Sequence, residues 1–239
     1  MIRGEKVRLD IHKILYSIYK FNYSLNTIQI QNIINEHKQS DKSLVNNVAL
    51  NSMRFNLHAS KIISKYIKKK IRDHERILLT SAITQIVFLN FKEYAVINCS
   101  VEIAKKLKIY PGLINATLKK ISQDKHELKY VVVKYDDLPD WFIEKTNFLK
   151  FKEKKDFLKN YCMEPNLHIV FKSSQKLENF EESLTKTSNI SGFLNNKINI
   201  SNIKSFKNGD WWVQDFSSFF PLNNLKTNNN KIKILDACA

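Results

Sequence analysis

The stretch that decides the fold, residues 95–121, reads AVINCSVEIAKKLKIYPGLINATLKKI. On both sides of Pro111-Gly112 the apolar residues recur at steps of three and four, and they are Val96, Cys99, Ile103, Leu107, Ile114, Leu118 and Ile121. This spacing places one apolar stripe along an α-helix. The stretch therefore predicts two consecutive amphipathic helices joined by a turn at Pro111-Gly112.

The same helical spacing extends back towards the beginning of the chain. Apolar stripes predict four further helices, over residues 9–19, 28–34, 44–71 and 78–89. We expect the third and fourth of these to meet near Arg72, where Asp73 is a suitable N-cap residue. No Gly or Pro interrupts the chain between Glu5 and Tyr110. These features predict a compact, all-helical bundle over residues 1–128.

After Lys129 the pattern changes to short, mixed elements. Strands are predicted over residues 130–135, 167–171, 198–203 and 211–213, and helices over residues 144–160 and 178–186. Leu138-Pro139 predicts a turn that leads into a helix, and Asn208-Gly209 predicts a turn before a strand. We expect a small α/β region over residues 129–225. The last residues, 231–239, read KIKILDACA and predict an apolar strand that stops with nothing to cover it, so we expect the sequence to be incomplete at its C-terminus.

Composition excludes several classes of protein. The 239 residues are 43% hydrophobic and 26% charged, which argues against wholesale disorder, and four Gly and four Pro exclude collagen-like and Pro-rich architectures. No run of eighteen apolar residues is present for a membrane span, and the N-terminus lacks the apolar segment of a secretory signal. We therefore expect a cytoplasmic protein.

Cysteine and histidine usage indicates neither a disulfide framework nor a metal site. The three cysteines, Cys99, Cys162 and Cys238, are odd in number and far apart, and the six histidines show no metal-ligand spacing. We expect no metal in this protein.

Charge favours a nucleic-acid partner. The chain has 39 Lys and Arg against 23 Asp and Glu, a net charge of +16, and such an excess suits a polyanion. Residues 1–128 hold 22 of the basic and 10 of the acidic side chains. Bias of an AT-rich gene towards Lys is the alternative explanation, but it does not account for this asymmetry. The N-terminal half is therefore expected to face the polyanion.

Two segments of the predicted bundle resemble NusB-type domains. Ala95–Ala104 is similar to their Ala-x-Asn-x-x-Val-Glu-x-Ala helix, and Gly112–Lys120 is similar to their Gly-x-Ile/Val-Asn-x-x-Leu-Arg helix. The resemblance implies a helical domain that binds RNA.

Four later segments resemble RNA cytosine-5 methyltransferases. Leu235–Ala239 resembles the start of their methyl-donor motif, Leu-Asp-x-Cys-Ala-Ala-Pro-Gly-Gly-Lys-Thr, and Gly209–Ser218 resembles their Gly…Val-Gln-Asp-x-Ser-x segment. Leu138–Trp141 resembles their Pro-x-Trp, and Met163–Phe171 resembles their Pro-x-x-x-Arg-x-Asn strand without its Arg and Asn. One bacterial family, the RsmB (Sun, Fmu) 16S rRNA cytosine-5 methyltransferases, joins all these pieces in this order. The resemblance implies that residues 226–239 are the first strand of a third, Rossmann-like methyltransferase domain that is cut short.

The methyltransferase resemblance implies a cofactor and a substrate. It implies that S-adenosylmethionine donates a methyl group to a cytosine of 16S rRNA, with Asp236, Cys238 and Ala239 at the donor pocket. Cys238 matches a pocket position, because the family's catalytic cysteines belong to motifs that follow the donor motif. We therefore expect the polypeptide as given to bind RNA, as a monomer and without a membrane, but to transfer no methyl group. The alternative for residues 235–239 is an ordinary core strand that ends in small residues.

The expected RNA-binding side chains lie on the predicted third helix. Lys61, Lys65, Lys68 and Arg72 follow at steps of four, three and four, so they share one side of a helix. In a NusB-like arrangement Arg3, Lys6 and Arg8 lie nearby, and together these residues could bind phosphates. A merely solvated charged face is an equal alternative.

Other polar and aromatic candidates have two interpretations each. Asp215 is either a helix N-cap, which we favour, or a residue near the donor pocket. Trp141, Trp211 and Trp212 either stack on bases or, as we favour, belong to the core.

A second class of function competes with the enzyme. A non-enzymatic, NusB-like antitermination or assembly factor also explains the basic helical half. The 110 or so residues after Lys129 count against it, because free-standing NusB proteins end after the last helix of the bundle.

Overall fold

The structure is a computed structural model that describes residues 3–196, 198, 200, 203–225 and 235, apart from the side chains of Arg3 and Leu222. The chain divides into two compact units, Met1–Met163 and Glu164–Ala239, which are considered one at a time. The functional division expected from sequence, into residues 1–128, 129–225 and 226–239, stays a prediction.

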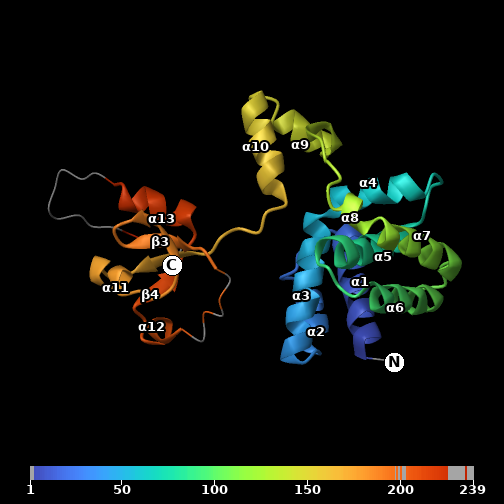
Figure 1. The fold of residues 1–239 in the computed structure, drawn as a ribbon, viewed down its shortest axis with the longest axis horizontal. Helices are drawn as coiled ribbons and strands as arrows, with labels where there is room; N and C mark the ends of the chain where they lie inside the picture. The colour runs from blue at the N-terminus through green and yellow to red at the C-terminus, as the bar shows by residue number, and fades with distance from the viewer. Residues whose placement is uncertain (1–2, 197, 199, 201–202, 226–234, 236–239) are drawn as a thin grey trace. The chain divides into compact units, whose positions relative to one another are not determined.

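The described part of the first unit contains helices and loops but no strand (Figure 1). Its bundle consists of α1 (Arg3–Phe21), α2 (Ile28–Asn35), α3 (Gln39–Arg54), α4 (Asn56–Tyr66), α5 (Asp73–Ile83), the π-helical turn η1 (Thr84–Phe88), α6 (Glu93–Lys106), α7 (Pro111–Gln123) and α8 (Lys125–Leu128). After the bundle come a 3₁₀ turn, η2 (Tyr135–Asp137), α9 (Asp140–Lys145) and α10 (Phe151–Tyr161). The expected all-helical bundle is confirmed, with α6 and α7 formed by the stretch at residues 95–121.

Helix α5 lies at the centre of the bundle. Every residue from Ile77 to Ile83 is buried, so this helix has no solvated face. One apolar cluster joins α4, α5, α6 and α7, and a second joins α1, α2 and α3 with Ile77 of α5. Burial of the apolar stripes against α5 is therefore what holds the unit together.

The long helix expected over residues 44–71 is wrong, because the chain turns at Phe55. There the backbone leaves the helical region (φ −95°, ψ 14°), and one helix ends at Arg54 while the next begins at Asn56. The Phe55 ring stacks on Phe88, with ring centroids 4.2 Å apart and ring planes at 3°. This contact with a residue distant in sequence replaces the continuous helix.

The segment after the bundle also differs from expectation. Residues 130–134 form no strand, and Val132 is 72% exposed. The helix expected over residues 144–160 is divided into α9 and α10, with Pro139 as the residue before α9.

The second unit is a small antiparallel sheet with short helices. Its strands are β1 (His168–Phe171), β2 (Leu184–Ser188), β3 (Ser191–Leu194) and β4 (Trp211–Val213), in the order β2-β3-β1-β4. All pairs are antiparallel, with Ile169 opposite Gly192 of β3 and Val213 of β4. The helices are α11 (Ser174–Glu178), α12 (Lys204–Lys207) and α13 (Phe216–Asn223).

Most of the sheet follows the sequence. The strands expected at 167–171 and 211–213 are confirmed, as is the turn at Asn208-Gly209, where Gly209 has φ +68°. The helix expected over residues 178–186 is wrong, because α11 ends at Glu178 and β2 begins at Leu184. Of the strand expected at 198–203, Ile203 instead precedes α12. The expected terminal strand, 231–239, lies outside the described residues except for Leu235.

The three tryptophans differ in burial. Trp211 is a core residue, as expected, at 2% exposure. Trp141 and Trp212 are 65% and 43% exposed, so the core interpretation is wrong for them. Among the described residues, no helix is both long and apolar enough to cross a membrane.

Candidate nucleic-acid interface

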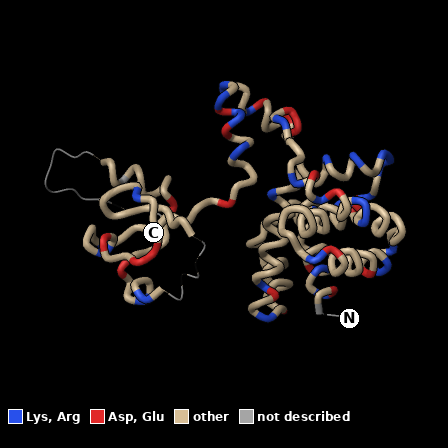
Figure 2. The backbone as a smooth tube through the Cα atoms, in the orientation of Figure 1, with Lys and Arg blue, Asp and Glu red and all other residues tan. Residues whose placement is uncertain are grey.

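A lysine-rich segment links α4 to α5. Helix α4 ends at Tyr66 because Ile67 adopts an extended backbone (φ −122°, ψ 111°) and buries its side chain. Residues 61–72 contain six basic side chains and no acidic one. Figure 2 shows Lys and Arg gathered along α4 and the loop that follows it. The segment therefore presents an excess of positive charge at one end of the bundle.

This segment and α7 enclose a groove of about 430 Å³. The groove, called here the lysine groove, is lined by Tyr66, Ile67, Lys68, Lys69, Leu113, Ala116, Thr117 and Lys120. Its three lysines are exposed, whereas Ile67 and Thr117 are buried. An apolar floor with lysines at its edge suits an elongated anion that carries apolar groups, and a nucleic-acid strand has this chemistry.

Tyr66 is fixed at the wall of the groove. Its hydroxyl donates a hydrogen bond to the carboxylate of Asp124, and Lys65 Nζ lies 5.6 Å from its ring centroid. Burial, followed by the hydrogen bond and negative charge of Asp124, raises the pKa of Tyr66 above its ordinary value, so the phenol stays neutral. The carboxylate of Asp124 is therefore engaged with Tyr66 at the wall of the groove.

The four basic residues expected on one helix face are not together on one helix. Lys65 lies on α4 and is exposed, and Lys68, beyond the end of α4, donates to the carbonyl oxygen of Ser64 at 3.0 Å and lines the groove. Arg72 precedes α5, where its backbone N–H donates to Glu75 Oε2 at 2.8 Å and its guanidinium pairs with Glu75 at 3.2 Å. The end of α4 at Tyr66 separates Arg72 from Lys65.

Lys61 has a different partner from the one expected. Its ammonium donates to the carbonyl oxygen of Val132 at 3.0 Å and pairs with Asp137. Partial burial opposes ionisation of Asp137, but the hydrogen bonds from Lys61 and from the Lys134 amide outweigh it and lower its pKa below the ordinary value. Lys61 therefore anchors the segment after the bundle to α4.

We expect Lys61→Met to release this anchor. The loss of a hydrogen bond and a half-buried ion pair should cost about 1 kcal/mol and accelerate amide hydrogen exchange over residues 132–137. The matched control is Lys65→Met, on the same helix but without these partners. Equal exchange of the segment in both variants would show that Lys61 holds nothing in place.

The N-terminal basic residues lie elsewhere on the bundle. Figure 1 places the beginning of α1 and the end of α4 at opposite ends of the bundle. Arg8 Nε donates to Gln85 Oε1 at 2.8 Å, and its Nη1 donates to the carbonyl oxygen of Gly4 at 3.1 Å, while Lys6 is exposed. The side chain of Arg3 is not described. The structure thus does not join Lys6 and Arg8 to the lysine groove.

Two of the groove residues were not predicted from the sequence. Lys69 and Lys120 belong to the lysine runs at 68–70 and 119–120, which were visible in the sequence. Only the packing of α7 beside the end of α4 brings these two runs to one groove.

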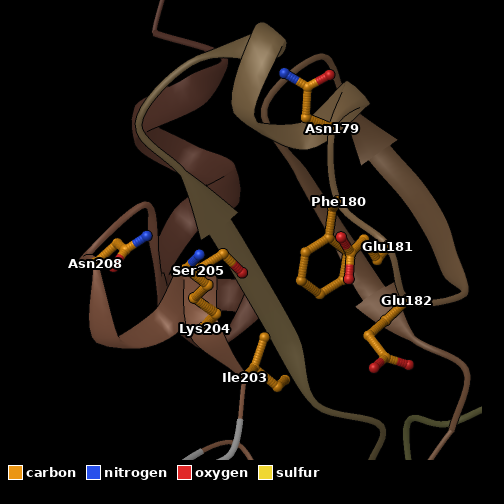
Figure 3. Close-up of a pocket in the computed structure, with 8 residues that line it drawn as sticks. All are labelled: Asn179, Phe180, Glu181, Glu182, Ile203, Lys204, Ser205 and Asn208. Atoms are coloured by element: carbon orange, nitrogen blue, oxygen red, sulfur yellow. The ribbon is translucent and has the colours of Figure 1, made fainter.

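The second unit contains a pocket of a different character (Figure 3). It encloses about 310 Å³ and is lined by Asn179, Phe180, Glu181, Glu182, Ile203, Lys204, Ser205 and Asn208. Ser205 Oγ accepts a hydrogen bond from Trp211 Nε1 at 2.9 Å. Because two carboxylates face one ammonium, this pocket does not favour a phosphate group.

Asp215 caps α13, as favoured from the sequence. Its Oδ1 accepts the backbone N–H of Ser217 at 2.7 Å, and bonding to Ser217 lowers the pKa of Asp215 below its ordinary value. The expected donor-pocket residues Asp236, Cys238 and Ala239 lie outside the described residues. Among the residues that the structure describes, no group of three or more His, Cys, Asp or Glu side chains is placed to hold a metal ion.

Comparison with known proteins gives a family for the bundle. Residues 5–123 match the model of the NusB family. Among solved structures, the crystal structure of PH0851 is similar with a TM-score of 0.45 and 11% sequence identity, over 91% of this chain and 54% of that one. The present chain thus spans about half the length of that protein. No curated protein matches the chain.

Proposed function

We propose, on the premise that residues 5–123 form a NusB family domain, that this domain binds RNA through the lysine groove. We further propose that the chain is the N-terminal part of a 16S rRNA cytosine-5 methyltransferase. The observation that carries RNA binding is the meeting of Lys68, Lys69 and Lys120 around one groove with an apolar floor.

The chemistry of the groove fits binding rather than catalysis. Lysine ammonium groups attract phosphates as point charges, with little dependence on base sequence. Among the described residues, the groove lining contains no Cys, His or carboxylate that could act as nucleophile or base. In the proposed enzyme this domain therefore holds the RNA, and the reaction takes place elsewhere.

The methyltransferase part of the proposal is supported by sequence. Gly209–Ser218, which resembles a segment of that family, contains β4 and the cap of α13. Asp236, Cys238 and Ala239 would hold S-adenosylmethionine, which supplies the methyl group when bound. Sequencing the gene beyond codon 239 tests this assignment. Codons for Ala-Pro-Gly-Gly-Lys-Thr support the enzyme, and a stop codon contradicts it in favour of a non-enzymatic RNA-binding factor.

We expect the triple variant Lys68→Glu/Lys69→Glu/Lys120→Glu to weaken RNA binding by at least tenfold at 100 mM KCl. Each lost lysine–phosphate contact lowers the salt dependence for a single strand by about 0.7, so the log–log slope should fall by about 2. Fluorescence anisotropy with a labelled single-stranded fragment of 16S rRNA, measured from 50 to 300 mM KCl, gives both quantities.

A control with the same change in net charge separates the groove from bulk electrostatics. Lys38, Lys92 and Lys105 are exposed on the bundle and do not line the groove. The triple variant Lys38→Glu/Lys92→Glu/Lys105→Glu should retain most of the affinity. Equal losses in the two triple variants would mean that overall charge, and not the lysine groove, binds the RNA.

A further inference from the structure

A second groove lies between α10 and the segment that follows the bundle. Its first part encloses about 420 Å³, between residues 132–136 and the side chains of Phe151, Lys154, Lys155 and Leu158. Its second part, about 320 Å³, continues towards His58, Lys159 and Tyr161. Both parts share Val132, Val133, Lys155 and Leu158, so they adjoin each other, and together they are called here the α10 groove.

The α10 groove offers an exposed aromatic face. Phe151, the first residue of α10, is 85% exposed although it is entirely apolar. Tyr135 forms part of the opposite wall, where its hydroxyl is hydrogen-bonded to Thr146. Exposed, apolar rings in a groove are suited to stacking with another planar group.

Lysines surround these rings. Lys134, Lys154 and Lys155 line the first part and Lys159 the second, against Asp136 as the acidic residue in the lining. Lys154 Nζ lies 4.8 Å from the centroid of the Tyr135 ring, and this cation–π contact keeps the Lys154 ammonium group at the groove. Figure 2 shows Lys and Arg along α10. Lysine side chains therefore lie beside the aromatic rings along the groove.

The anchor at Lys61 makes one wall of the groove a fixed structure. Lys61 donates a hydrogen bond to the carbonyl oxygen of Val132 and forms an ion pair with Asp137. The wall residues between these two positions are therefore held at both ends. Phe142 and Phe157 support the other side, with ring centroids 5.1 Å apart. A groove with both walls held in place loses little entropy when a ligand binds.

We infer that the α10 groove binds a segment of single-stranded RNA, with a base stacked on Phe151 and the neighbouring phosphates on Lys154, Lys155 and Lys159. Base faces are hidden in a duplex, so the stacking contact selects unpaired strands. A peptide of Asp and Glu alone would satisfy the lysines but has no aromatic ring to stack on Phe151. The inference rests on the proposed RNA-binding function and adds the form of RNA that this protein prefers.

The test compares Phe151→Ala with Phe148→Ala in the full chain. Phe148 is 74% exposed in the preceding loop and does not line the α10 groove, so it is a matched control. The probes are fluorescein-labelled twelve-nucleotide oligouridine and a labelled twelve-base-pair RNA duplex. Phe151→Ala should weaken oligouridine binding about tenfold and leave duplex binding unchanged, whereas Phe148→Ala should change neither. Far-UV circular dichroism confirms that the folds are equal.

The possible failures are distinguishable. Wild-type affinity of Phe151→Ala for oligouridine overturns the α10 groove inference, and the proposed function survives if the triple variant at the lysine groove still loses binding. Failure of the wild-type chain to bind either RNA overturns both. Equal affinity for oligouridine and for polyglutamate of twelve residues also overturns the inference, because it would show a general polyanion site.

Discussion

Trp211→Ala should unfold the second unit and leave the helical bundle intact. Trp211 packs against Phe180 and Phe206, with ring centroids 5.8 Å and 5.0 Å away, and its indole N–H is bonded to Ser205. Truncation of such a core aromatic costs about 3–5 kcal/mol. Among the described residues of this unit, the buried core is a small cluster around Ile169, Phe171 and Trp211, so a loss of this size approaches the whole stability of the unit.

Hydrogen exchange followed by mass spectrometry measures this effect. Protection should disappear from β1 and β3 but persist in α5, α6 and α7, since the bundle has its own core. Trp212→Ala is the matched control, because the neighbouring side chain is 43% exposed and its loss should cost less than about 1 kcal/mol. Equal stability of the two variants would show that Trp211 does not hold this core together. Lost protection in the bundle would show that the two units unfold as one.

Where burial follows a regular spacing, the sequence was sufficient to predict the fold. Helices α6 and α7 each bury one stripe against the bundle. The strand at Ile169 and Phe171 was predicted from the alternation of its residues, although all four of them are buried. Such periodicity is a local signal, because each element carries its own apolar pattern. The main elements of the bundle and of the sheet were therefore within reach of sequence analysis.

Where a single tertiary contact decides the backbone, the sequence was misleading. At the helix break Phe55 stacks on Phe88, and the segment at 130–134 is held by Lys61 rather than by a neighbouring strand. The β-branched residues of that segment favoured a strand by propensity, but propensity yields to such contacts. Neither partner can be identified from the local pattern.

The candidate site contains some residues that the sequence predicted and others that only tertiary packing brings there. Lys68 was predicted from the basic run, and it lines the lysine groove. Lys120 lies about fifty residues further along the chain, and only the packing of α7 beside the end of α4 brings it there. Lys61 had the right spacing for a phosphate ligand, but its ammonium is bound to Val132 and Asp137. Charge spacing along one helix cannot reveal such partners.

Lowering the pH from 7.5 to 4.5 should destabilise the bundle through His12 by roughly 2–3 kcal/mol. This α1 side chain is 1% exposed, and its Nε2 lies 3.0 Å from Nδ1 of His74 on α5. Burial, and next the charge of His74, lower the pKa of His12 from 6.5 to about 4. The unfolded chain takes up a proton below pH 6.5, whereas the folded chain resists it until about pH 4. Stability from this group is therefore complete above pH 6.5 and is lost as the pH falls towards 4.

Urea denaturation, followed by helical circular dichroism at both pH values, isolates the contribution of His12 when the wild type is compared with His12→Gln. Glutamine keeps a polar group beside His74 but does not titrate, so the stability difference between the two pH values should shrink by roughly 2–3 kcal/mol. His126→Gln removes an exposed histidine and should leave that difference unchanged. Carboxylates that titrate in the same range contribute equally to all three proteins and cancel in the comparison. An unchanged difference in His12→Gln would mean that His12 is protonated in the folded bundle as readily as in the unfolded chain, which its burial against α5 argues against.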